Sequence, residues 1–214
     1  MSLPLPPLSL LETRILGTLA EKQRTVPDTY PLSINALQAG CNQKTSRHPV
    51  MEASEGAIVE ALEHLESLGL VRRVSGGRVS RFEHVLGKTL GIPTQAEAIV
   101  TVLMLRGPQT AGELRLNCER LHRFVDISSV EAFLGELAER PEGALVVELP
   151  RLPGARENRW GHLLSGEPAA AEAKVKVAEP AAQELLALQA RVEMLEQQMA
   201  ELNALVQALR AGSV

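Results

Sequence analysis

The stretch from Ser54 to Leu86 limits the possible folds of this chain more than any other. Between Ile58 and Leu68, apolar residues recur at the spacing of one helix face, which predicts a helix there. Ser54 is a suitable N-cap for this helix. Gly69 stands where a helix commonly ends in a left-handed residue. The chain therefore carries a capped amphipathic helix that ends directly before the next predicted element.

That next element is a two-stranded hairpin. β-branched residues mark strands over Val71–Val74 and Val79–Val85, and Ser75-Gly76-Gly77-Arg78 between them suits a tight turn. A helix that runs through glycine into such a hairpin is typical of the second half of a winged helix-turn-helix. A winged helix usually offers this helix to a DNA groove and the hairpin tip to the DNA backbone.

The same order of elements occurs twice along the chain. In the first occurrence, a helix capped by Ser9 and Glu12 and a short helix over 31–40 precede the stretch already described. The second occurrence predicts helices over 94–106, 110–118 and 128–140 and strands over 144–149 and 157–163. Capping boxes are expected at Thr94 and Glu97, Thr110 and Glu113, and Ser128 and Glu131.

Residues agree between the two occurrences as well as order. Three sets match in register: Val59-Glu60-Ala61 with Val130-Glu131-Ala132, Leu37 and Cys41 with Leu114 and Cys118, and Arg81-Phe82-x-His84-x-Leu86 with Arg159-Trp160-x-His162-x-Leu164. Such agreement in equivalent elements favours a duplicated architecture. We predict a mainly α chain with small β-hairpins, built from two tandem winged helix-turn-helix domains at 9–90 and 91–164. An arm at 1–8 precedes them.

Beyond residue 164, an Ala- and Pro-rich linker is expected at 165–180 and a coiled-coil dimerisation helix at 181–212. Eight apolar residues alternate by three and four positions: Leu185, Leu188, Val192, Leu195, Met199, Leu202, Val206 and Leu209. Leu at every d position favours two parallel strands, so we predict a homodimer. The alternative is that the helix folds back onto its own domains.

The composition limits the classes of function. The net charge is −4, so the whole chain has no general attraction to a polyanion. Two isolated cysteines, Cys41 and Cys118, make a zinc site improbable and, with no signal peptide, indicate a reducing cytoplasm. No apolar run is long enough for a membrane helix. No nucleophile elbow or phosphate-binding loop is present, so we expect a protein that is not an enzyme and needs no metal or cofactor.

Three separated motifs resemble the YceH-like family of bacterial proteins. They are Asn42 to Met51 (NQKTSRHPVM), Leu103 to Thr110 (LMLRGPQT) followed by Gly112 to Arg115, and Leu149-Pro150-Arg151-x-Pro153-Gly154 leading to Arg159-x-x-His162-Leu163. The resemblance covers about residues 8–164 and leaves out the heptad helix. It implies two tandem winged-helix domains and no settled biochemical function.

Double-stranded DNA is the partner that the predicted fold suggests. The first ninety residues hold ten Lys or Arg against nine Asp or Glu, and the rest of the chain is acidic. The candidate nucleic-acid contacts lie in the loop before the helix and in the hairpin: Asn42, Gln43, Lys44, Arg47, Arg72, Arg73 and Arg78. Arg78 at the hairpin tip can reach a phosphate, and the loop residues can reach base edges. The expected role is transcriptional regulation.

Glutamates on the same helix argue for a different partner. Its solvent face should carry Glu60, Glu63 and either Glu66 or Ser67, and the corresponding helix of the second domain exposes Glu131, Glu139 and Glu136. Such faces repel phosphates, so the alternative is a protein-interaction or assembly module that uses these acidic surfaces. Residues 42–47 separate the two hypotheses, because a loop packed between the two domains favours the protein-binding one.

His84 and His162 occupy equivalent places beside an aromatic residue, which indicates packing or hydrogen bonding at the base of each hairpin rather than a metal or proton role. Cys41 and Cys118 are expected to be small core residues.

Overall fold

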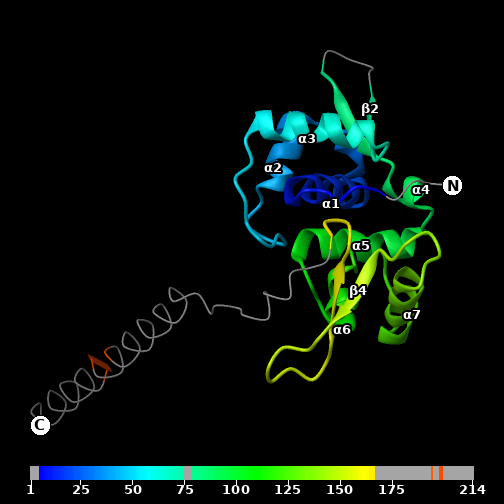
Figure 1. Cartoon of the computed structure of the whole chain (residues 1–214). Coiled ribbons are helices and arrows are strands. Elements are labelled where there is room, and N and C mark those ends of the chain that lie inside the picture. The colour runs from blue at the N-terminus through cyan, green and yellow to red at the C-terminus, as the bar shows by residue number, and fades with distance from the viewer. Residues whose placement is uncertain (1–4, 75–78, 167–193, 195–197, 200–214) are drawn as a thin grey trace, which may run out of the picture. The chain divides into compact units, whose positions relative to one another are not determined.

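A computed structural model describes residues 5–74, 79–166, 194 and 198–199 (Figure 1). The helices of the first part are α1 (Leu10–Thr25), the 3-10 helix η1 (Pro27–Thr29), α2 (Ile34–Cys41), α3 (Glu55–Ser67) and α4 (Leu86–Leu90). The later helices are α5 (Thr94–Arg106), α6 (Ala111–Asn117) and α7 (Ile127–Ala138). The strands are β1 (Leu32–Ser33), β2 (Val71–Val74), β3 (Arg81–His84), β4 (Val146–Leu149) and β5 (Arg159–His162).

The first part of the chain has the architecture of a winged helix. β2 and β3 form the antiparallel hairpin, and β1 pairs with the other edge of β3 to give a three-stranded sheet in the order β1-β3-β2. Ser54 caps α3 through its side chain, and Gly69 has the expected positive φ of 67°. The prediction of a helix that ends in glycine and passes into a hairpin is therefore confirmed.

The second part repeats this arrangement in detail. β4 and β5 form the equivalent antiparallel hairpin, and Gln109 bridges to Trp160 of β5. In the first part, Leu32 pairs with Phe82 of β3 in the same way. Leu32 and Gln109 each lie two residues before a short helix, α2 or α6, so the equivalence extends to a third strand position. The mixed α and β fold, with a duplicated winged-helix architecture, is as predicted.

Helices α1 and α5 join the two parts through their long buried faces (Figure 1). In α1 every residue from Glu12 to Ala20 is buried, and in α5 every residue from Ala98 to Leu105. Leu8 extends the contact, because its amide donates to the carbonyl of Leu164 at 2.8 Å. The described residues from 5 to 166 accordingly form one compact unit. The division of this unit into domains at 9–90 and 91–164 stays a prediction.

Several boundaries differ from the sequence prediction. α5 has Pro93 at its N-cap with no side-chain cap, so the expected box of Thr94 and Glu97 is wrong. α7 is capped by Asp126, whose carboxylate accepts from the Ser129 amide, rather than by Ser128. β1 and α4 were not predicted. The cap of α7 is a local interaction, whereas β1 forms only by pairing with β3.

Most of the predicted coiled coil lies outside the described residues. Of its eight heptad positions only Met199 is described; it is helical and 64 % exposed. Leu185, Leu188, Val192, Leu195, Leu202, Val206 and Leu209 are not described, and the dimer stays a prediction. In the described residues, every helix is too short or too polar to cross a membrane.

Candidate functional site

α3 carries the surface that a winged helix would present to a groove. Its inner face is fully apolar, with Ile58, Leu62 and Leu65 buried in the core. Its outer face exposes Glu55, Glu60 and Glu63, whereas the helix contains no Lys or Arg. The predicted acidic character of this face is confirmed, and it would bring carboxylates toward phosphates in any groove.

The two arginines of β2 already have carboxylate partners. Arg72 pairs with Glu83 across the two strands, and Arg73 donates to Glu66 of α3 at 2.8 Å. Both arginines remain solvent-exposed. Ion pairs in such positions are worth roughly 0–1 kcal/mol, so either guanidinium could exchange its carboxylate for another anion. Arg78 lies outside the described residues.

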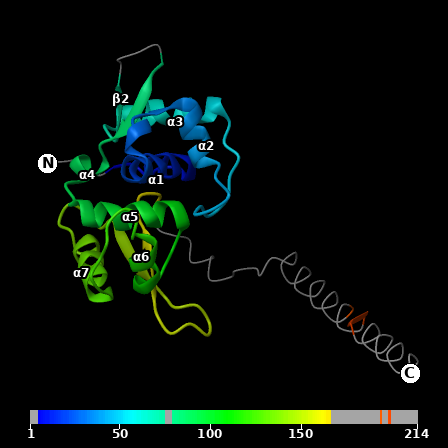
Figure 2. The same cartoon turned by 180° about the vertical axis from the view of Figure 1, so that it is seen from behind.

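The loop between α2 and α3 runs along the side of the molecule and comes down to the end of α5 (Figure 2), and Arg47 is buried within it although its neighbours are exposed. The Arg47 side chain is 0 % exposed, and its guanidinium donates to both carboxylate oxygens of Glu21, at 3.1 and 2.6 Å. Arg47 also donates to the Gly40 carbonyl at 3.1 Å. The interpretation of Arg47 as a nucleic-acid contact is therefore corrected, because its donors are directed into the protein.

Neighbouring residues fix the same loop against α5. The His48 amide donates to the Leu105 carbonyl at 2.8 Å, and Arg106 donates to the Ser46 hydroxyl at 2.8 Å. Residues 46–48 thus lie between α1 and α5. This is the arrangement that favours the protein-binding hypothesis over the DNA-binding one.

The remaining loop candidates divide into occupied and open side chains. The Asn42 amide donates to the Ala53 carbonyl at 2.9 Å and accepts from the Ala53 amide at 2.8 Å, so it holds the end of the loop. Lys44 is exposed, and Gln43 is half-buried at the rim of a cleft. Of the seven predicted contacts, Lys44 is the one on this loop that solvent reaches freely.

The corresponding surface of the second part is also acidic. α7 buries Val130, Leu134 and Leu137. It exposes Glu131 and Glu136, and Glu139 at its C-cap is exposed as well. α7 contains no Lys or Arg, so both helices in the groove-facing position have the same polarity.

His84 and His162 take the structural role predicted for them. They occupy equivalent registers, opposite Val71 and Val146, and His84 Nε2 lies 2.9 Å from the Gln23 amide oxygen. Burial lowers the pKa of His84 to about 4, with a smaller contribution from the charge of Arg24. Burial likewise lowers the pKa of His162 to about 4. Both imidazoles are therefore neutral in the folded protein near pH 7.

We expect the protein to lose stability as the pH falls from about 6.5 toward 4. In this window both histidines bind protons in the unfolded chain but not in the folded chain. Each histidine therefore lowers the free energy of unfolding by up to about 1.4 kcal/mol for each pH unit of acidification. Urea unfolding between pH 7.5 and 4.5 measures this slope. The H84Q and H162Q variants should each flatten it, and an unchanged slope in both would contradict the assignment.

Cys41 and Cys118 are free, fully buried thiols, as predicted. Burial raises the pKa of Cys41 to about 11 and that of Cys118 to about 12, which keeps both protonated. In the part of the chain that the structure describes, no group of three His, Cys, Asp or Glu side chains has the arrangement of a metal site.

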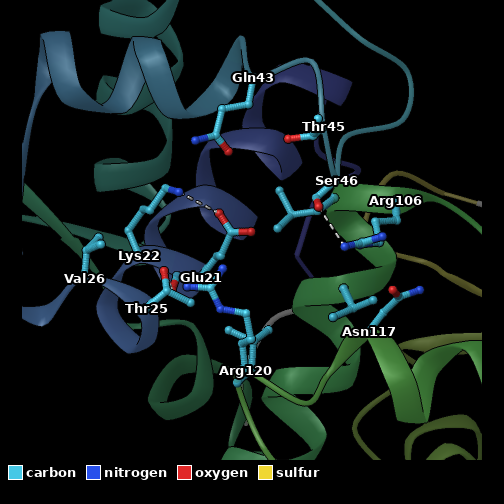
Figure 3. Close-up of a pocket in the computed structure, with 13 residues that line it drawn as sticks. Glu21, Lys22, Thr25, Val26, Gln43, Thr45, Ser46, Arg106, Asn117 and Arg120 are labelled. Carbon is cyan, nitrogen blue, oxygen red and sulfur yellow. Dashed lines mark hydrogen bonds and ion pairs between the residues drawn. The ribbon is translucent and has the colours of Figure 1, made fainter.

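A cleft of about 260 Å³ between α1, the α2–α3 loop and the α5–α6 region was not anticipated from the sequence (Figure 3). Its charged lining comes from Glu21, Lys22, Arg106 and Arg120. These residues are separated by up to about a hundred positions, and only the packing of α1 on α5 brings them together. No local motif marks such a site, although each residue alone could be noted as a charge at or near a helix end.

Comparison with known proteins gives a family and no activity. Residues 8–155 match a family model described as "Protein of unknown function, DUF480". The chain is 72 % identical over 202 residues to a UPF0502 protein of Dechloromonas aromatica (strain RCB), covering 94 % of this chain and 95 % of that protein. UPF0502 proteins of Burkholderia orbicola (strain MC0-3) and Burkholderia multivorans (strain ATCC 17616 / 249) are 58 % and 60 % identical, each over 94 % of this chain and 87 % of their own length. The chain thus belongs to the DUF480 (UPF0502) family, in agreement with the YceH-like resemblance of its motifs.

Proposed function

We propose that this protein is a non-enzymatic interaction module whose α3 face binds a basic surface on a protein partner in the cytoplasm. The observation that carries the proposal is the polarity of α3, which exposes Glu55, Glu60 and Glu63 and has no Lys or Arg. The packed α2–α3 loop supports it, since Arg47 is bound to Glu21 inside the protein. A winged helix of this kind serves as a rigid scaffold for a charged helix face.

Double-stranded DNA is the second candidate partner, with a regulatory role. Exposed Lys44 on the α2–α3 loop and exposed Arg72 and Arg73 on β2 support it, because all three side chains are open to solvent and can contact phosphates. Such contacts would neutralise few phosphates and would have to outweigh the glutamates of α3. DNA binding of this type should weaken steeply with salt.

Replacing Glu60 and Glu63 together with alanine is expected to weaken partner binding by about tenfold or more, because charged hydrogen bonds contribute about 1.5–3 kcal/mol each. The full-length protein carrying a photo-crosslinker at Ser67 captures the partner, and titration with the purified partner gives the affinity. The paired substitution of Glu131 and Glu136 on α7 is the matched control. Alanine at these exposed helix positions leaves the fold intact.

The same variants distinguish the two candidates on a fluorescent DNA duplex. Saturable duplex binding that is lost on replacing Lys44, Arg72 and Arg73, and is unchanged or improved by E60A/E63A, would overturn the protein-binding proposal in favour of DNA. Loss of binding to one purified protein partner in E60A/E63A, without such a loss in the α7 control, would support the protein-binding proposal.

A further inference from the structure

The cleft between α1 and α5 is lined by both polar and apolar residues (Figure 3). α1 contributes Glu21, Lys22 and Thr25, and the chain after α1 contributes Val26. The α2–α3 loop adds Gln43, Thr45 and Ser46. α5, α6 and the turn after α6 add Val102, Leu105, Arg106, Asn117, Arg120 and Leu121. Three separate segments of the chain therefore converge on one concave space.

The charge of this cleft is opposite to that of the protein. Glu21 is its one acidic lining residue, and the buried guanidinium of Arg47 neutralises it through two hydrogen bonds. Burial alone would raise the pKa of Glu21, but the hydrogen bonds and charge of Arg47 outweigh it and lower the pKa. Together with Lys22, which also contacts Glu21, Arg106 and Arg120 give the lining a net positive charge. A positive cavity thus lies in a chain whose net charge is −4.

The positive groups differ in how fully they are engaged. Lys22 lies 3.3 Å from a Glu21 oxygen that Arg47 already binds, and Arg106 donates one hydrogen bond to Ser46. No hydrogen bond or ion pair joins Arg120 to another described residue, and its side chain extends toward α1 in Figure 3. A guanidinium has five donors, so Arg106 and Arg120 retain donors for a bound group.

Hydroxyl groups complete the donor set. Thr45 and Ser46 line the same space as the three cations, and the Gln43 amide lies beside them. Thr25 and Asn117 also line it, but the Thr25 hydroxyl donates to the Glu21 carbonyl and the Asn117 amide to Gln109. Tetrahedral oxyanions are bound well by planar guanidinium groups together with hydroxyl donors, because each oxygen accepts several hydrogen bonds. A simple carboxylate has only two oxygens and would leave more of these donors without a partner.

We propose that this cleft binds a small metabolite that carries a phosphate group. The volume of about 260 Å³ accepts a phosphoryl group and a short carbon skeleton, but it is below the range of cavities that hold nucleotides or larger cofactors. Lys22, Arg106 and Arg120 bind the phosphate, and the side chains of Val102, Leu105 and Leu121 contact the skeleton. The site is distinct from the α3 face and does not depend on the function proposed for that face.

Titration of the full-length protein with inorganic phosphate and with glycerol 3-phosphate tests the proposal. Calorimetry at constant ionic strength, with chloride as the balancing anion, should give saturable binding at one site per chain. The R120A variant should bind at least about tenfold more weakly, since one lost charged hydrogen bond is worth about 1.5–3 kcal/mol. R123A removes an exposed arginine three residues away that does not line the cleft, and it should bind as the unmodified protein does.

The possible outcomes separate a site from general surface charge. Arg120 is exposed, so R120A retains the fold, and circular dichroism verifies this. A tenfold loss in R120A with an unchanged R123A supports the proposal. It is overturned by absence of binding at millimolar ligand, by equal loss in both variants, or by a DNA duplex that binds through Arg120 while both phosphate probes do not.

Discussion

Replacing Arg47 with alanine is expected to lower the free energy of unfolding by about 3–5 kcal/mol, the usual effect of breaking a buried ion pair from one side. The Arg47 side chain is 0 % exposed and the Glu21 side chain 17 %. Alanine would leave the Glu21 carboxylate largely desolvated, with Lys22 as its remaining partner, and would remove the donor to Gly40. Since this one guanidinium joins α1, α2 and the loop, its loss should also loosen residues 42–53.

Urea unfolding of R47A, E21Q and the double variant measures the effect and the coupling between the two residues. The double variant should recover part of the stability, because it leaves no unpaired buried charge. R73A is the matched control: its pair with Glu66 is exposed and should change stability by less than about 1 kcal/mol. If R47A and R73A lower the free energy of unfolding by the same amount, the pair of Arg47 and Glu21 has no special structural role.

Replacing Gly17 with leucine is expected to cost about 3 kcal/mol, near the upper end of the range for overpacking a core. Gly17 lies in α1 where α1 crosses α5, and a Cβ built there would be 2.9 Å from both Cγ and Cδ2 of Leu105. Leu105 is itself 3 % exposed, so it has little room to move. The variant therefore tests whether the α1–α5 contact is indispensable to the compact unit.

The matched control for Gly17 is Gly135, another helix glycine, around which a Cβ meets no atom within 4 Å. G135A should stabilise the protein by up to about 1 kcal/mol through helix propensity, whereas G17A should destabilise it. Thermal unfolding followed by circular dichroism compares them. If G17L unfolds in one cooperative transition at a lower temperature, the two halves of the unit unfold together. If G17L is as stable as the unmodified protein, the close packing of α1 on α5 is contradicted.

Local sequence signals were sufficient for the elements that depend on their own residues. Ser54, Gly69 and the strand at Val71–Val74 could be predicted because caps, left-handed glycines and β-branched runs act within a few positions. The cap of α5 could not be predicted in this way. Glu97 is instead hydrogen-bonded to the Gly87 backbone, a contact that requires α4 to be in place.

The acidic face of α3 could be predicted because helical periodicity assigns Glu60 and Glu63 to the side opposite the core. The location of Arg47 could not, since a polar loop has no periodicity and its partner, Glu21, is twenty-six residues away. α1 shows a further limit: its capping box was predicted, but the burial of the polar residues Thr13, Arg14 and Thr18 was not. Arg14 and Thr18 are buried against α2 and the loop after it, where Arg14 donates to the Cys41 and Pro49 carbonyls at 3.0 and 2.7 Å.

The hydrogen bond from Leu8 to Leu164 has a topological consequence. Both leucines are buried, at 3 % and 6 % exposure, so the first and last segments of the compact unit pack against each other. Removing the residues before residue 10 would expose Leu164, and removing the residues after residue 160 would expose Leu8. A circular permutant that links the two ends of the compact unit with a short peptide would preserve the contact between Leu8 and Leu164. Its new termini would lie elsewhere on the surface.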